Sequence, residues 1–182
     1  MDRPSHYIEY EELKQKINSI TNPQHRNFIK LMYACCARIG EVVRNNPSCK
    51  ANQPIAGHQI KALPQHMVVE VLTEKVNTLR RVPVSRVLEP WLTEPLITLS
   101  KYNQGHLFPF STRWGQKIFL KWFNTERTHL LRKWRATHLL QGKCTRKRLT
   151  EAQVMKIGGW TDTRALHKHY SGVIIEDYME SV

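Results

Sequence analysis

Two short motifs in this sequence contain an arginine that could bind a phosphate group. The first is Arg38-Ile39-Gly40-Glu41, and the second is His129-Leu130-Leu131-Arg132. A guanidinium is a planar fork that can pair with two phosphate oxygens, and two such forks can stabilise the charge that develops when a phosphate ester is attacked. The attack also needs a nucleophile and an acid that protonates the leaving oxygen. A tyrosine and a lysine or histidine would complete this set.

Candidates for these roles follow one another along the chain. Lys75 lies in a polar turn eight residues before Pro83, between the two arginine motifs, and Tyr170 follows Trp160 by ten residues. Taken singly, each has an ordinary interpretation, because a turn lysine is usually solvated and an aromatic residue usually packs in a core. Their occurrence in this order favours a joint catalytic role.

A mainly helical fold would position these residues. The β-branched run His66 to Leu72 predicts a strand, and Arg80 to Val84 predicts a second one, with Pro83 typical of a sheet edge. These strands would form a hairpin whose turn contains Lys75. We expect an α+β fold, mainly α, with a small antiparallel sheet of about three strands near 58–85. Apolar residues at helical spacing predict helices over 8–20, 24–44, 87–103, 112–127, 129–141, 150–157, 162–170 and 173–180.

The chain is strongly basic, with 28 Lys and Arg against 15 Asp and Glu among 182 residues, a net charge of +13. A folded domain of this charge is expected to bind a polyanion. No acidic residue lies between Glu126 and Glu151, and Arg113, Lys117 and Lys121 share one helix face. An ordinary solvated surface is the alternative interpretation. The predicted DNA-binding residues are Arg113, Lys117, Lys121, Lys133, Arg135, Arg146, Lys147 and Arg148.

The composition excludes several classes of protein. The 41% of apolar residues can build a core, and no apolar run approaches the ~18 residues of a membrane span. The four cysteines (Cys35, Cys36, Cys49 and Cys144) form no CxxC pair, which argues against zinc and for a reducing, cytoplasmic compartment. The sequence contains no Gly-rich ATP loop and no acidic cluster beside the basic motifs, so we expect neither ATP nor a metal ion as cofactor.

The ordered motifs resemble the catalytic domain of tyrosine recombinases, the integrase family of phages, archaeal viruses, plasmids and chromosome-dimer resolution systems. In that family an Arg box with Ile and Glu precedes a lysine turn and an Arg-x-Val-Pro strand. A His-x-x-Arg box then leads into Ala-Thr-His-Leu-Leu, which residues 129–140 match closely. The last box has Gly, then His or Trp, ahead of the tyrosine. Trp160 and Tyr170 are one residue further apart than is usual, and Tyr178 lies too far along for the pattern.

The resemblance implies a site-specific recombinase or integrase that cleaves and rejoins DNA strands through a 3′-phosphotyrosyl bond. Tyr170 would attack the scissile phosphate, and Lys75 would protonate the departing 5′ oxygen. Arg38 and Arg132 would stabilise the charge on the attacked phosphorus group.

Three further residues would have supporting roles. His129 would exchange a proton near the phosphate or the attacking tyrosine, and Trp160 would position the phosphate and exclude water. Glu41 would hold Arg38 or Lys75 in place without itself contacting the substrate.

The resemblance also implies an organisation and partners. Residues 1–182 would be a single catalytic domain without the N-terminal core-binding domain that clamps DNA in family members, either as an isolated domain or as a naturally minimal enzyme. Residues 171–182 would form a tail helix that docks on a neighbouring protomer, because family members act as a tetramer on two duplexes of a specific site. Its apolar face would contain Ile174, Ile175, Tyr178 and Met179.

Other functions are compatible with parts of the pattern. A type IB topoisomerase-like enzyme would use the same chemistry to nick and reseal one duplex, and would relax supercoils without strand exchange. A non-catalytic DNA-binding accessory protein on the same fold would have no need of Arg38, Lys75, Arg132 and Tyr170 together. An RNA-binding protein is a more distant alternative.

Overall fold

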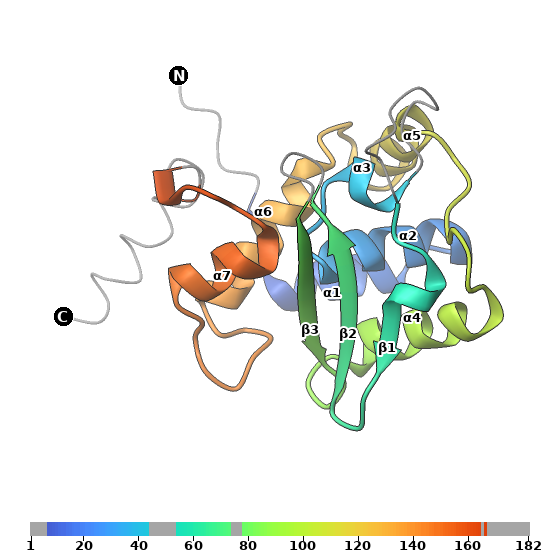
Figure 1. Cartoon of the computed structure of the whole chain (residues 1–182). Coiled ribbons are helices and arrows are strands. Elements are labelled where there is room, and N and C mark those ends of the chain that lie inside the picture. The colour runs from blue at the N-terminus through green and yellow to red at the C-terminus, as the bar shows by residue number, and fades with distance from the viewer. Residues whose placement is uncertain (1–6, 44–53, 74–77, 165, 167–182) are drawn as a thin grey trace, which may run out of the picture.

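The computed structural model describes residues 7–43, 54–73, 78–164 and 166 (Figure 1). They form seven α-helices, a short 3₁₀ helix and one antiparallel sheet of three strands. The predicted fold class, mainly helical with a small antiparallel sheet, is confirmed. In chain order the elements are α1 (Tyr10–Asn18), α2 (Pro23–Ala34), α3 (Ile39–Val42), η1 (Gly57–Gln59), β1 (Ile60–Ala62), β2 (His66–Leu72), β3 (Leu79–Ser85), α4 (Pro90–Tyr102), α5 (Thr112–Phe123), α6 (His129–Leu140) and α7 (Glu151–Gly158).

The sheet has the strand order β1-β2-β3, with neighbouring strands antiparallel. Buried and more exposed positions alternate along β2 and β3, so one face of the hairpin enters the core. Val69 lies opposite Val82 on this face, and Val71 lies opposite Arg80. β3 forms one edge of the three-stranded sheet, which is where a proline such as Pro83 is tolerated.

Helices cover one side of the sheet, its β3 edge and one end of its strands (Figure 1). Figure 1 shows α1, α2 and α4 behind the strands, α6 and α7 beside β3, and α3 and α5 above. α2 contacts α1, α4 and α6, and its Phe28, Leu31 and Met32 side chains are fully buried. Burial of each such side chain stabilises the fold by about 1.5–3 kcal/mol. α2 is therefore the centre of the core against which the neighbouring helices pack.

The predicted helix over 24–44 is wrong, because the chain turns in the middle of it. α2 ends at Ala34, and Cys36 adopts a left-handed φ of 51°. Such a backbone costs roughly 1–2 kcal/mol at a non-glycine residue. Two contacts with α6 accompany it: the Cys36 Sγ donates to the Arg132 carbonyl (3.2 Å), and the Cys36 carbonyl accepts from Arg132 Nη1 (2.6 Å). The turn is itself buried, so the apolar pattern continues through it and does not reveal the break.

The other described helices lie close to their predicted ranges. The predicted break at Asn22-Pro23 is present, because Asn22 caps α2 by accepting a hydrogen bond from the His25 N–H (3.0 Å). α5 ends at Phe123, four residues early, because Asn124 adopts a left-handed φ of 55°. The helices predicted over 162–170 and 173–180 fall mostly or wholly outside the described residues. No helix in the described ranges is long and apolar enough to cross a membrane.

Candidate active site

Arg38 lies at the turn between α2 and α3, where one carboxylate holds it. Its backbone N–H donates to Glu41 Oε2 (2.9 Å), and its Nη1 lies 3.4 Å from Glu41 Oε1. The Glu41 side chain is fully buried, whereas that of Arg38 is 26% exposed. The short helix therefore fixes both the backbone and the side chain of Arg38 while part of its guanidinium stays accessible. This is the contact expected of a residue that supports Arg38.

Glu41 binds a second cation, Arg80, whose place in the site was not predicted from the sequence. Arg80 Nη2 donates to Glu41 Oε2 (2.8 Å), and Nη1 donates to Oε1 (3.2 Å). The sequence contains a signal for this residue, because Arg80 alternates with Val82 and Val84 on β3. A strand that buries those two valines also buries Arg80, and a buried cation requires an anionic partner.

Arg132 lies in the first turn of α6 and is only 6% exposed. Its Nη1 donates to the carbonyls of Cys36 and Gly158, at 2.6 Å each. Among the described residues, no carboxylate forms an ion pair with Arg132, and its buried Nη2 has no hydrogen-bond partner. Burial lowers the pKa of this guanidinium, and the nearby cations Arg38 and Arg80 act in the same direction, whereas Glu41 opposes them from a distance. The arrangement suits an anion, because a buried positive charge without a counter-ion is costly.

Trp160 forms one wall beside Arg132. The Arg132 Cζ atom lies 3.9 Å from the centre of a Trp160 ring, in a cation–π stack that fixes the plane of the guanidinium. Gly159 precedes Trp160 with a left-handed φ of 68°. A Cβ atom at Gly159 would lie 3.1 Å from Thr73 Oγ1 and 3.2 Å from Arg80 Cδ, so the end of α7 approaches the β2–β3 hairpin closely.

Two predicted catalytic residues, Lys75 and Tyr170, lie outside the described residues. The segment that contains Lys75 starts and ends at described positions, because Thr73 N–H donates to the Thr78 carbonyl (2.9 Å). The Thr73 hydroxyl also accepts from Arg80 Nη1 (3.0 Å). The base of this segment therefore lies beside the Arg80–Glu41 pair.

His129 is the first residue of α6 and is exposed. It precedes Arg132 by three residues, so the two lie on neighbouring positions of one helix face. Its position at the surface is compatible with a role near a bound phosphate.

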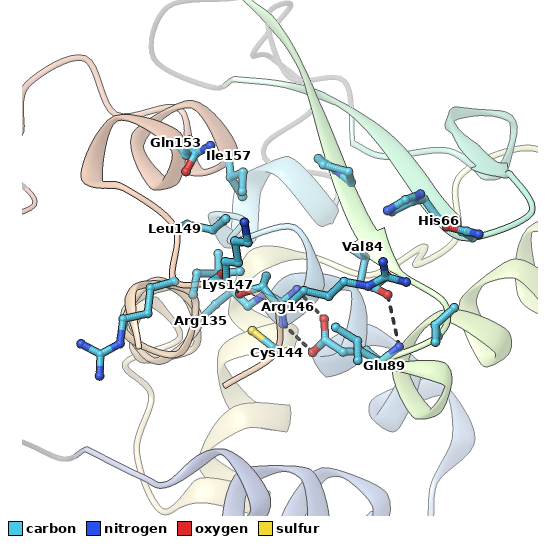
Figure 2. A pocket seen from close by; sticks show the side chains of 18 residues that line it. His66, Val84, Glu89, Arg135, Cys144, Arg146, Lys147, Leu149, Gln153 and Ile157 are labelled. Atoms are coloured by element: carbon cyan, nitrogen blue, oxygen red, sulfur yellow. Dashed lines mark hydrogen bonds and ion pairs between the residues drawn. The ribbon is translucent and has the colours of Figure 1, made fainter. Parts of the chain in front are cut away.

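The prediction that Arg135 binds DNA is wrong. This residue is 2% exposed, and its Nη1 and Nη2 donate to the two oxygens of Glu89 at 2.6 and 2.8 Å (Figure 2). Arg135 lies four residues from both Leu131 and Leu139, which are buried, so it is on the inward face of α6. The basic composition of this stretch gave no information about helical phase.

The predicted basic face of α5 is present. Arg113, Lys117 and Lys121 are all exposed along this helix, which contains no acidic residue. α5 contacts α3, the helix that begins after Arg38. An exposed row of cations therefore lies next to the element that holds one of the two site arginines.

The remaining basic residues lie elsewhere. Arg146, Lys147 and Arg148 are exposed in the loop between α6 and α7 and line a cavity of about 580 Å³ whose walls include Val84 and Ile157 (Figure 2). In Figure 1 this loop and α5 are at opposite ends of the molecule. Lys133 is half-buried, and burial together with Arg127 lowers its pKa. The basic stretch after Arg127 is therefore not one continuous face.

The cysteines behave as core residues. Cys35, Cys36 and Cys144 are buried free thiols, and Cys49 lies outside the described residues. Burial raises the pKa of Cys35 to about 12 and that of Cys144 to about 11, so both thiols stay protonated near neutral pH. In the described part of the chain, no group of three or more His, Cys, Asp or Glu side chains could hold a metal ion.

Comparisons with known proteins place this arrangement in a fold. No family model and no curated protein sequence matches the chain. Two similar solved structures are complexes of the XerH site-specific recombinase: one post-cleavage with a palindromic difH substrate (15% identity, TM-score 0.62) and one pre-cleavage with difH (14%, 0.60). The aligned regions cover 93% and 92% of this chain and 50% of each XerH chain, so this chain spans about half the length of the XerH chains. The likeness shows the fold of a tyrosine recombinase catalytic domain and confirms the expected fold.

Proposed function

We propose that this chain, with the fold of a tyrosine recombinase catalytic domain, is a site-specific DNA recombinase or integrase that cleaves and rejoins DNA strands through a 3′-phosphotyrosyl intermediate. The observation that carries the proposal is Arg132, a buried cation without a carboxylate partner among the described residues, stacked on Trp160 and close to Arg38. A scissile phosphate would supply the missing anion. The DNA-bound state of both XerH structures supports DNA as the source of that phosphate.

The proposed reaction exchanges ester partners at phosphorus. The Tyr170 oxygen forms a bond to phosphorus, the bond from phosphorus to the 5′ oxygen breaks, and a phosphotyrosine and a 5′ hydroxyl result. An unperturbed tyrosine has a pKa near ~10, so Tyr170 loses its proton during the attack, while the departing oxygen takes a proton from Lys75. Rejoining reverses these steps with the 5′ hydroxyl of a DNA strand. Because each step breaks one phosphate ester bond and forms another, the energy of the broken bond is conserved.

The described residues would stabilise this reaction in different ways. Arg38 and Arg132 would bind the non-bridging oxygens, whose charge grows in the transition state. Trp160 would hold the Arg132 fork in plane and exclude water. His129 would exchange a proton with the phosphate or with Tyr170.

The decisive experiment uses duplexes with a nick next to the cleavage position, from which the cleaved fragment diffuses away and traps the covalent complex. We expect a protein–DNA adduct that survives SDS. Tyr170→Phe removes one oxygen and keeps the ring, so it should abolish the adduct and preserve folding and DNA binding. Tyr178→Phe is the matched control and should keep the adduct. Attachment of the DNA to any residue other than Tyr170, found by mapping the DNA-linked peptide, would overturn the assignment.

The adduct assay, combined with plasmid relaxation and strand exchange between two duplexes, separates the alternatives. A type IB topoisomerase-like enzyme would form the adduct and relax a supercoiled plasmid, but would not exchange strands between two duplexes. An accessory DNA-binding protein would bind the duplex and form no adduct.

The proposed DNA contacts are the exposed row Arg113, Lys117 and Lys121 on α5, together with Lys133, whereas the loop residues 146–148 at the other end of the molecule (Figure 1) are assigned a different partner below. Cations that neutralise phosphates release counterions, so affinity should fall steeply as salt is raised. Charge reversal at two α5 positions should weaken binding to all sequences alike and reduce the salt slope by about two. An unchanged slope would remove α5 from the interface.

We also propose that the protein assembles as a tetramer on DNA through residues 171–182. This segment contains three acidic residues, Glu176, Asp177 and Glu180, and no basic one, beside several apolar residues. The cavity of Figure 2 is complementary to it, because the exposed cations Arg146, Lys147 and Arg148 line a space whose walls also include Val84 and Ile157. We assign this cavity as the acceptor for the tail of a second copy. Deletion of 173–182 should impair recombination more than DNA binding.

A synthetic peptide of residues 171–182 tests the acceptor directly. The wild-type protein should bind it, and charge reversal at Arg146, Lys147 and Arg148 should abolish this binding. If that variant instead loses DNA affinity and still binds the peptide, these cations face DNA and the cavity is not the acceptor.

A further inference from the structure

We propose that Arg80 is a positioning residue that holds the three catalytic segments of the site in one geometry. The inference rests on the proposed function. Arg80 is 7% exposed, and all five of its N–H donors have acceptors within the protein. It therefore has no donor left for a substrate, in contrast to Arg132. What distinguishes Arg80 is that its acceptors belong to three separate parts of the chain.

The first part is the turn that presents Arg38. Arg80 Nη2 donates to Glu41 Oε2 (2.8 Å) and to the Cys35 carbonyl (3.4 Å), and Nη1 donates to Glu41 Oε1 (3.2 Å). Glu41 in turn accepts from the backbone and the guanidinium of Arg38. Arg80 thus fixes both ends of the carboxylate that orients Arg38.

The second part is the base of the segment that contains Lys75. Arg80 Nη1 donates to Thr73 Oγ1 (3.0 Å), and the Thr73 N–H donates to the Thr78 carbonyl (2.9 Å). The Thr73 side chain is therefore oriented by Arg80 at the point where the Lys75 segment begins.

The third part is the end of α7, which leads to Trp160 and then to Tyr170. Arg80 Nε donates to the Ile157 carbonyl (2.9 Å), and the next carbonyl along, that of Gly158, accepts from Arg132 Nη1 (2.6 Å). Adjacent peptide groups of α7 are thus bound by the two arginines. The close approach of Gly159 to the Arg80 side chain completes this contact.

The chemistry of the side chain explains why arginine is required. A guanidinium presents five donors in a rigid plane, whereas a lysine ammonium is a point charge that cannot reach three separated acceptors. Arg80→Lys should keep a positive charge beside Glu41 and lose the hydrogen bonds to Thr73 and Ile157. A displacement of about 1 Å in a catalytic group can cost roughly 100-fold in rate. We therefore expect adduct formation by Arg80→Lys to slow about 100-fold, with DNA affinity changed less than about threefold.

Arg81 provides the matched control. It is the next residue on β3, its side chain is 73% exposed, and it lies 3.4 Å from Glu70 on the outer face of the sheet. Arg81→Lys should form the adduct at the wild-type rate. If Arg80→Lys is poorly folded by circular dichroism, the double variant Arg80→Met with Glu41→Gln removes both buried charges and should fold, yet should still cleave at least 100-fold more slowly.

A substrate with sulfur in place of the bridging 5′ oxygen distinguishes positioning from general structural damage. A thiolate leaves without protonation, so it does not need the acid that Lys75 would supply. Thr73→Val breaks only the tie to the Lys75 segment, and its slow cleavage should be restored by the sulfur substrate. Two results would overturn the inference, given that the wild-type protein forms the adduct. One is an unchanged rate of adduct formation in Arg80→Lys, and the other is cleavage by Thr73→Val that stays slow on the sulfur substrate. Absence of the adduct in the wild-type protein would instead overturn the proposed function.

Discussion

Arg132 and Arg135 lie one turn apart on α6, are both buried, and have opposite surroundings. Arg135 donates to both oxygens of Glu89, which also accepts from the Tyr10 hydroxyl (3.0 Å). Arg132 donates to two backbone carbonyls and, among the described residues, has no carboxylate partner. The helix therefore buries one arginine with its counter-ion and one without.

This difference separates a structural arginine from one suited to a ligand. A buried ion pair with good geometry offsets the cost of removing its charges from water, whereas an uncompensated buried cation retains that cost until an anion arrives. Charge and burial alone do not distinguish the two residues. The partner distinguishes them, and each arginine should respond differently to the same substitution.

The largest expected effect is on stability, at Arg135. Arg135→Met should leave the Glu89 carboxylate buried and unpaired, and should reduce the free energy of unfolding by about 3–5 kcal/mol. Urea denaturation of the variant and the wild-type protein measures the change. The double variant Arg135→Met with Glu89→Leu should recover most of the loss, because no charge then remains buried. If the single and double variants were equally unstable, packing rather than charge pairing would dominate this region.

The same substitution at Arg132 should spare the fold and remove the chemistry. Arg132→Met loses two hydrogen bonds to carbonyls, at a cost of about 1–3 kcal/mol, but also removes an uncompensated buried charge, so the two effects largely cancel. Adduct formation on nicked duplexes should fall by about 100- to 1,000-fold, the usual loss for a donor to the charge of the transition state. A strongly destabilised variant that still cleaved would reverse the roles assigned to the two arginines.

The comparison also shows what the sequence could and could not predict. The β2–β3 hairpin was predictable because its signal is local, a period-two alternation of β-branched residues. Arg38 and Arg132 were singled out through the spacing of short motifs, and the chemistry assigned to them stays a prediction. The roles of Arg80 and Arg135 were missed because each depends on a carboxylate that is distant in sequence: Glu41 is 39 residues from Arg80, and Glu89 is 46 residues from Arg135.

Counting positions around the helix could have corrected the prediction for Arg135, but not the missed turn at Cys36. Arg135 falls four residues after Leu131 and four before Leu139, so a count along the helix places it on the apolar face. The turn at Cys36 had no such signal, because buried apolar residues continue on both sides of the break. A left-handed cysteine is fixed by its contacts with α6, which sequence periodicity does not contain.

A loss of stability in acid is expected from His138, a buried residue near Arg135 on α6, and it provides a further test of the comparison. His138 lies one turn further on, and its ring nitrogens bind the Tyr33 hydroxyl (2.7 Å) and the Ile8 carbonyl (2.9 Å). Burial lowers the pKa of His138 to about 4, and the cation Arg135 acts in the same direction. In the unfolded chain the pKa is near ~6.5, so only the unfolded state takes up this proton between those values.

Stability should therefore fall as the pH drops through this window, by up to about 3 kcal/mol at pH 4 from this residue. His138→Gln keeps an acceptor and a donor without the titration, so the variant should lose less stability than the wild-type protein between pH 7 and pH 4.5. Denaturation at both pH values measures the difference. Parallel losses in the two proteins would assign the acid response to other groups.

The smallest expected effect concerns the ring that covers Arg132. Trp160 stacks on the guanidinium at 3.9 Å, and such a contact is worth about 1–2 kcal/mol when it is shielded from water. Trp160→Leu should therefore slow adduct formation about tenfold, whereas Trp160→Phe keeps an aromatic face and should slow it less. In the background of Arg132→Met the ring has no cation to orient, so Trp160→Leu should then have almost no additional effect. This double-mutant cycle on nicked duplexes isolates the stacking contribution. Equal effects of Trp160→Leu in both backgrounds would show that the ring acts on the DNA or on the core independently of Arg132.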